Sequence, residues 1–161
     1  MKKYGFLLLL AFCGVLSNCS KDKWNEPLDI SYQAKIDVND NNVINDKIEY
    51  KDIIGYDTSN YTFLIDSNAI KKIRNYFFPS GGLAFSVSVM GEIVYTGKFF
   101  PSYSNTLPYG ITIDPEESLM GNKLTVKIDY GFCLTDNTLK DLRNDKRIIA
   151  VLQRDHKLIH L

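Results

Sequence analysis

The sequence predicts an α+β fold: a single domain over residues 30–161, with a mostly antiparallel sheet of five or six strands and two helices packed on one face. Three observations support this prediction. Several stretches alternate apolar and polar residues, as strands with one buried face do. Two other stretches place apolar residues on one helical face behind a capping residue. A chain of 161 residues can also build one hydrophobic core without disulfides.

The strands are expected wherever apolar residues alternate or cluster between turn-forming residues. The first alternating run ends at the polar cluster Asp40-Asn41-Asn42, and the clearest pair is a hairpin in which Gly91 supplies the positive φ of a Met90-Gly91 turn. Residues 115–118 are expected to be a turn between the last two strands. The extended stretches cover residues 30–38, 47–54, 61–66, 83–89, 92–99, 109–114 and 123–130.

Two helices are expected, one in the middle of the chain and one near residue 161. Ser67 can cap a helix over 68–77, where Ile70, Ile73 and Phe77 share one face, and residues 79–82 end it. Asn144-Asp145 can cap a second helix over 146–154, which has an apolar face flanked by basic and amide side chains. The chain is therefore expected to close with an amphipathic helix.

The first nineteen residues have the layout of an exported protein's signal. Lys2 and Lys3 precede an apolar run of twelve residues, which is shorter than the ~20 that a membrane span needs. Leu16-Ser17-Asn18-Cys19 then resembles the lipobox of bacterial lipoproteins, although Asn18 replaces the usual small residue. The resemblance implies removal of residues 1–18 and lipid, including palmitate-like acyl chains, on Cys19. The alternative is a plain signal peptide or an uncleaved anchor, with Cys19 as an ordinary thiol.

Two wider resemblances follow. Cys19-Ser20-Lys21-Asp22 and the stretches 52–57 and 91–97 resemble small lipoproteins of Bacteroidota. This likeness implies a lipid-anchored protein of the cell envelope with residues 19–29 as its tether. Because 20–23 lacks an acidic run, attachment to the outer membrane facing the periplasm is expected. The order of elements from 61 onward is similar to the first periplasmic head region of the SecD and SecF proteins, but no functional motif is shared.

The most distinctive composition lies in the segment 99–109, which mixes aromatic residues with Ser, Asn and Pro. Such segments are typical of recognition loops, because a rigid ring offers a large contact area at small entropic cost. Phe100, Tyr103 and Tyr109 are therefore the candidate binding residues, for a protein or glycan partner. The alternative is that these rings only cover one end of the sheet.

Metal sites are weakly supported. The segment 37–45 resembles the start of a calcium loop, but Asn42 stands at the glycine position and Ile48 at the terminal carboxylate position, so a solvated turn is expected. His156 and His160 have the i, i+4 spacing of zinc helices without a third ligand nearby in sequence, which favours surface histidines. No metal and no cofactor are predicted.

Catalysis has little support in the sequence. Cys133 is expected to be a small buried residue, and the carboxylates of Glu116 and Glu117 are expected to be solvated in a turn. Without residues 1–18 the chain carries two more acidic than basic side chains, so no nucleic-acid partner is predicted. The sequence favours a non-catalytic binding domain. The alternatives are an envelope enzyme with a site not visible in sequence and an immunity-like inhibitor of another protein.

Overall fold

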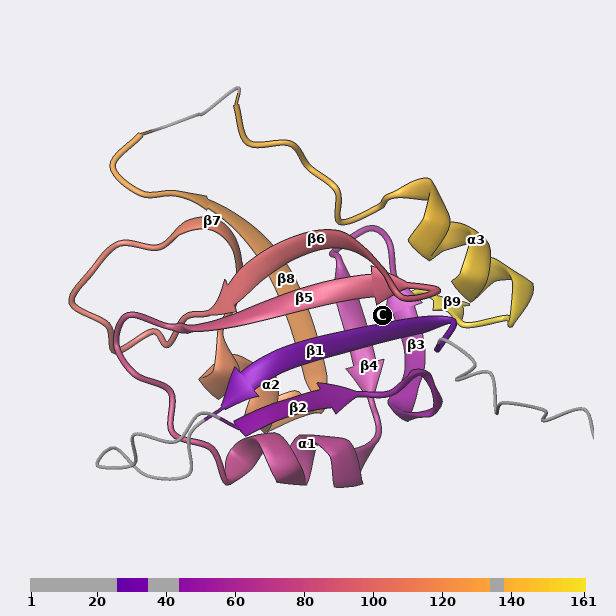
Figure 1. Ribbon diagram of the computed structural model, residues 1–161, viewed down its shortest axis with the longest axis horizontal. Helices are drawn as coiled ribbons and strands as arrows, with labels where there is room; N and C mark the ends of the chain where they lie inside the picture. The colour runs from indigo at the N-terminus through magenta and orange to yellow at the C-terminus, as the bar shows by residue number, and fades with distance from the viewer. Residues whose placement is uncertain (1–25, 35–43, 134–137) are drawn as a thin grey trace, which may run out of the picture.

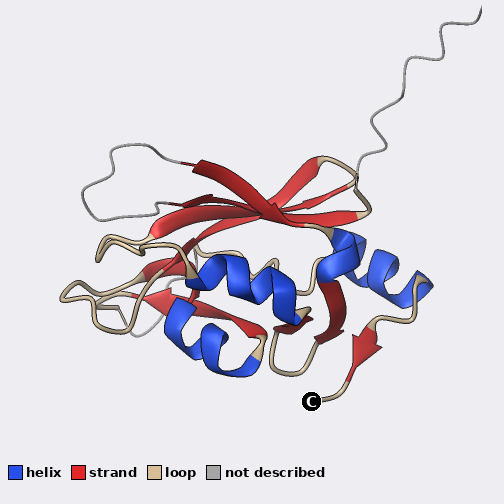
Figure 2. Cartoon of the chain, turned by 90° about the horizontal axis from the view of Figure 1, so that it is seen from below, coloured by secondary structure: helices blue, strands red, loops and turns tan. Residues whose placement is uncertain are grey.

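The computed structural model describes residues 26–34, 44–133 and 138–161. Within these residues nine strands form one sheet, and Figure 2 shows all three α-helices on the same side of β1, β2, β5 and β6. The strands are β1 (Leu28–Ala34), β2 (Ile44–Ile48), β3 (Ile53–Asp57), β4 (Thr62–Ile65), β5 (Leu83–Val89), β6 (Glu92–Phe99), β7 (Tyr109–Ile113), β8 (Lys123–Tyr130) and β9 (Leu158–Ile159). The helices are α1 (Ser67–Arg74), α2 (Pro115–Gly121) and α3 (Lys146–Arg154), and η1 (Tyr50–Asp52) is a 3₁₀ turn. The predicted α+β class of a single domain is confirmed.

The strand order is β2-β1-β5-β6-β7-β8-β4-β3-β9. The pairs β6–β7 and β3–β9 are parallel and the other neighbours are antiparallel, so the predicted antiparallel character is also confirmed. In Figure 1, β1, β5 and β6 run across the view, whereas β3, β4 and β8 run up and down behind them. The sheet therefore curls, and its buried side chains fill the space between the two halves and the helices.

The expected number of five or six strands is wrong: all seven extended stretches enter the sheet, one of them as two strands, and β9 is added. The stretch 47–54 is not one strand, because η1 separates β2 from β3; the Glu49 amide donates to Asp52 Oδ2 at 3.2 Å and closes this turn. The chain also does not close with a helix. After α3 it turns through His156, with φ of 55°, and adds β9 to the edge of β3.

The expected number of two helices is also wrong, because residues 115–121 form α2 instead of a turn. Asp114 caps α2 by accepting hydrogen bonds from the Glu116 and Glu117 amides, and Pro115 lacks the amide that a first helical residue leaves unused. The helix α1 is capped by Asp66 and not by Ser67, and it ends at Arg74 instead of residue 77. The helix over 146–154 and its Asp145 cap are confirmed.

The predicted hairpin is confirmed as β5 and β6. Met90 and Gly91 both have positive φ, 51° and 80°, as the tightest hairpin turns require. A register shift between Val87 and Ser88 places an extra residue on β6 and increases the bend of this pair.

Phe99, at the end of β6, is the centre of the main aromatic cluster. Its fully buried ring lies 5.6 Å from that of Tyr32, 5.5 Å from that of Phe78 and 5.3 Å from that of Phe85, measured between centroids. These tilted and edge-on arrangements are the favourable ones for aromatic pairs. The cluster ties β1, β5, β6 and the segment after α1 together directly beneath the start of the 100–108 loop.

The buried carboxylate of Asp57 fixes the last residues of the chain. Asp57 is 1% exposed and accepts hydrogen bonds from the Ser59 hydroxyl at 2.6 Å, from the Leu161 amide at 2.7 Å and from the Ser59 amide at 2.8 Å. These bonds, that of the Ser59 hydroxyl first, lower the pKa of Asp57 to about 2. The negative charge of Asp57 therefore helps to hold β9 and Leu161 against β3.

This carboxylate predicts an acid-side loss of stability. Because folding lowers the pKa of Asp57 from its usual value near 4, its ionised form stabilises the fold above about pH 4, and this contribution is lost as the pH falls towards 2. Urea unfolding midpoints measured from pH 5 to pH 2 should fall more steeply for the native chain than for Asp57→Asn. Parallel curves for the two proteins would contradict the assignment.

Candidate functional site

The aromatic loop, defined here as residues 100–108, connects β6 to β7 at one end of the sheet. Along the β5–β6 hairpin, Val89 pairs with Leu28 at one end and Leu83 pairs with Phe99 at the other. The seven residues of β5 span roughly 20 Å at about 3.3 Å each. The aromatic loop therefore lies at the opposite end of β5 from the point where the chain enters the domain (Figure 1).

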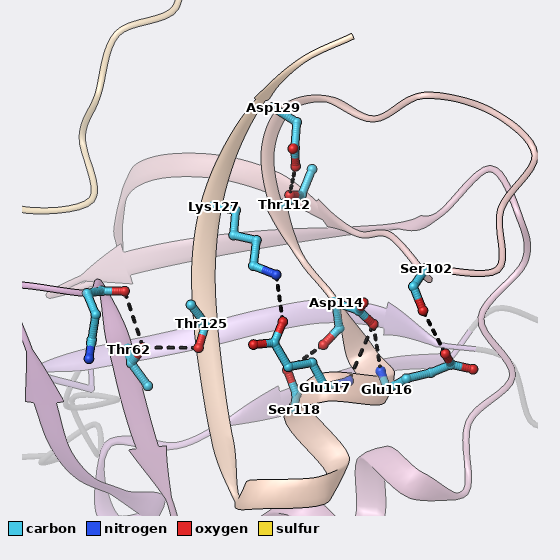
Figure 3. A network of polar contacts seen from close by, with 11 residues as sticks. Thr62, Ser102, Thr112, Asp114, Glu116, Glu117, Ser118, Thr125, Lys127 and Asp129 are labelled. Carbon is cyan, nitrogen blue, oxygen red and sulfur yellow. Dashed lines mark hydrogen bonds and ion pairs between the residues drawn. The ribbon is translucent and has the colours of Figure 1, made fainter. Parts of the chain in front are cut away.

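Three side chains of the aromatic loop fasten it to neighbouring elements. The Tyr103 hydroxyl donates to the Phe78 carbonyl at 2.5 Å, and the Ser104 hydroxyl donates to the Ser80 carbonyl at 2.8 Å. The Ser102 hydroxyl donates to Glu116 Oε2 of α2 at 2.8 Å (Figure 3). A loop held in this way loses little conformational entropy when a ligand binds.

The three candidate rings have different surroundings. Tyr103 and Tyr109 are each 54% exposed, whereas Phe100 is half-buried against Gly82, where a Cβ would lie 3.3 Å from its ring. Tyr109 lies on the other side of the loop, beside Gly131. Leu107 and Phe132 are also largely exposed, so four large apolar side chains face solvent in this part of the molecule.

A small cavity of about 260 Å³ lies between the aromatic loop and strands β7 and β8. The loop supplies apolar side chains and hydroxyl groups to its lining, whereas the residues on the side of the strands include charged side chains. The lining residues are Phe100, Pro101, Ser102, Ser104, Thr106, Leu107, Pro108, Thr112, Asp114, Lys127 and Asp129. The structure thus brings Phe100 to the cavity but places Tyr103 and Tyr109 outside its lining.

The charged side of the cavity is a network of hydrogen bonds (Figure 3). The Lys127 ammonium lies 2.6 Å from Glu117 Oε2, and the Thr112 hydroxyl donates to Asp129 Oδ2. The Glu117 carboxylate accepts a hydrogen bond from the Lys127 ammonium and so raises the pKa of Lys127. The charges of Asp114 and Asp129 also raise this pKa. The ammonium therefore stays charged, and its side chain is held in place.

This arrangement is suited to binding through hydrogen bonds. Among the described residues, Asp114 Oδ2 and Asp129 Oδ1 have no hydrogen-bond partner, so both oxygens can accept from a ligand. The sequence interpretation missed these residues. No local pattern in the sequence could have found them, because Thr112 and Lys127 lie opposite each other only through the pairing of β7 with β8.

The structure separates the other candidates from this site. Cys133 is exposed, so the expectation that it would be buried is wrong: it lies beyond the end of β8, outside the packed sheet. His156 follows the end of α3 and His160 follows β9, so the two rings do not share a helical face. Glu116 and Glu117 lie in the first turn of α2.

No group of three His, Cys, Asp or Glu side chains that could hold a metal ion occurs in residues 26–34, 44–133 and 138–161. Most of the calcium-like segment 37–45 and the lipidation candidate Cys19 lie outside the described residues. In the described part of the chain, no helix is long and apolar enough to cross a membrane. Comparisons with protein-family models, curated proteins and solved structures find no match to this chain.

Replacing Tyr103 with alanine should have a small effect on stability. The ring is half exposed, so the main loss is its hydrogen bond to the Phe78 carbonyl, and the free energy of unfolding should fall by about 1 kcal/mol. Tyr103→Phe removes only the hydroxyl and should account for most of this loss. Urea unfolding of both variants tests this, and a loss of ~3 kcal/mol or more would show that the ring is part of the core.

Proposed function

We propose that this chain is a lipid-anchored, non-catalytic binding domain of the cell envelope. It is held by lipid on Cys19 to the outer membrane, facing the periplasm, and its recognition surface is the aromatic loop with Tyr109 and Phe132. The observation that carries this proposal is that the exposed Tyr103 and Leu107 lie on a loop fastened by three side-chain hydrogen bonds, with the exposed Tyr109 and Phe132 beside it. Large exposed apolar groups on a fixed frame are characteristic of binding surfaces.

The position of the surface supports the proposal. The tether enters the domain at Leu28, and the aromatic loop lies at the opposite end of the β5–β6 hairpin. A domain tethered through residues 19–29 can therefore present this end away from the membrane, towards soluble or wall-bound partners.

A protein partner fits the exposed rings best. Tyr103, Leu107, Tyr109 and Phe132 offer apolar contact area, and tyrosine is enriched where one side chain must supply both apolar and polar contacts. A glycan is the second candidate, favoured by the adjoining cavity, where Asp114 and Asp129 offer free acceptor oxygens beside the Phe100 ring. In the alternative of an immunity-like inhibitor, the same surface would bind the protein that is inhibited.

Site-specific crosslinking tests the recognition surface in the native host. A photo-reactive amino acid at position 107, where the leucine is 53% exposed, should give a discrete crosslinked product with a protein or a glycan. The same amino acid at position 153, an exposed glutamine of α3, is the matched control. Equal crosslinking at both positions, or none at 107, would refute the proposal.

Labelled palmitate tests the anchor. The native chain should incorporate label and fractionate with outer membranes, whereas Cys19→Ala should do neither. Cys133→Ala is the control, because this exposed thiol lies in the folded domain and should not carry the lipid. Label that persists in Cys19→Ala would contradict lipidation at this residue.

A further inference from the structure

The parallel strands β6 and β7 pair only at one end. Lys98 pairs with Thr112 and Phe99 with Ile113, and no further pair of these strands occurs among the described residues. If the register continued, Gly97 would face Ile111 and Tyr95 would face Tyr109. The ladder pairing therefore ends at Lys98, although the Gly97 backbone still lies close to the Ile111 carbonyl. A cavity of about 560 Å³, within the size range of small-molecule sites, is lined by residues of both strands at this point.

The walls of this cavity, called here the β6–β7 cavity, are mainly apolar. The segment before α3 contributes Leu139, Lys140 and Leu142 to the lining. Both leucines are half-buried, and Ile111 and the buried Tyr95 supply further apolar surface. The remaining lining residues are Ala84, Thr96, Gly97, Lys98, Tyr109 and Gly110.

Two cationic side chains line the same cavity. Lys98 on β6 and Lys140 in the segment before α3 are both exposed, and neither forms an ion pair with any described residue. The nearest acidic residue in sequence, Asp141, is engaged by Arg143, with 2.8 Å between Arg143 Nη2 and Asp141 Oδ2. An apolar cavity with two unneutralised ammonium groups complements a ligand that has an apolar body and a negative end.

We propose that the β6–β7 cavity binds a small amphiphilic carboxylate, with its apolar body against Ile111, Leu139 and Leu142 and its carboxylate between Lys98 and Lys140. This site is separate from the aromatic loop, although Tyr109 borders it. The proposal therefore does not depend on the function proposed above. The ligand must be negatively charged, because a neutral or cationic amphiphile would leave both lysines without a partner of opposite charge.

Calorimetry with octanoate, octanol and octylamine tests the proposal on the full chain in a zwitterionic buffer of low ionic strength. The three probes have eight carbon atoms each and similar apolar chains, so the main difference between them is the charge of the head group. Octanoate should bind at least about tenfold more tightly than octanol, and octylamine should not bind measurably. Amide resonances of Gly97 and Gly110 should shift on titration with octanoate, because both residues line the cavity.

Matched lysine variants complete the test. Lys98→Gln with Lys140→Gln should remove the preference for octanoate over octanol, whereas Lys123→Gln with Lys146→Gln, two exposed lysines outside the cavity, should preserve it. Thermal melts should show that both double variants stay folded. The proposal is overturned if octanoate and octanol bind equally to the native chain, if octanoate shows no saturable binding, or if both double variants lose the preference alike.

Discussion

Replacing Phe99 with alanine is expected to lower the free energy of unfolding by about 3 to 5 kcal/mol, the usual cost of truncating a fully buried aromatic residue. The ring contacts those of Tyr32, Phe78 and Phe85, which come from three separate segments of the chain. These neighbours cannot all move inwards to fill the space. Because small domains are stable by only about 5 to 15 kcal/mol, the variant should be largely unfolded well below the melting temperature of the native chain.

The measurement is urea unfolding followed by tyrosine fluorescence and far-UV circular dichroism. Phe99→Leu keeps most of the volume and should cost less than half as much as Phe99→Ala. Tyr109→Ala is the surface control, because that ring is half exposed and should cost less than either. Similar losses for Phe99→Ala and Tyr109→Ala would contradict the assignment of Phe99 to the core.

A methyl group at position 97 should also destabilise the fold, by about 1 to 3 kcal/mol, the usual cost of overpacking. A Cβ on Gly97 would lie 2.5 Å from the Ile111 carbonyl oxygen and 2.5 Å from Cζ of Phe85. The first contact is with backbone, so relief requires β6 and β7 to move apart at the place where their pairing already ends. The second contact would displace a ring of the Phe99 cluster.

Gly81→Ala is the matched control for Gly97→Ala. Nothing lies within 4 Å of a Cβ at Gly81, and its φ is not positive, so alanine there should leave stability unchanged or raise it slightly by restricting the unfolded chain. Thermal unfolding of the two variants under identical conditions gives the comparison. If Gly97→Ala left thermal stability unchanged, β6 and β7 would have to separate without any loss of stability, which would contradict the prediction.

Local patterns in the sequence predicted the elements that depend on neighbouring residues. The β5–β6 hairpin follows from Met90-Gly91 between two β-rich runs, and α3 follows from Asp145 before an apolar helical face. The helix α2 was missed although Asp114-Pro115-Glu116-Glu117 carries its start signals, because its seven residues contain too few apolar positions to show a period.

The remaining features depend on which strands meet, and no local pattern records this. The two residues of β9 are too few for a period-two signal, and they form a strand only because the edge of β3 is available. The aromatic loop was predicted from its composition. The cavity beside it was not, because Thr112, Lys127 and Asp129 lie on two strands and come together only through the pairing of β7 with β8.

The parallel pairing of β3 with β9 has a consequence for the order of folding. Tyr56 pairs with Leu158 and Asp57 with Ile159, across about a hundred residues of chain. The edge of β3 therefore stays open throughout synthesis until residues 158–161 have left the ribosome. Contacts so distant in sequence raise the relative contact order and slow folding to the millisecond-to-second range typical of β-rich domains. Until then the chain lacks the edge strand β9 of its sheet.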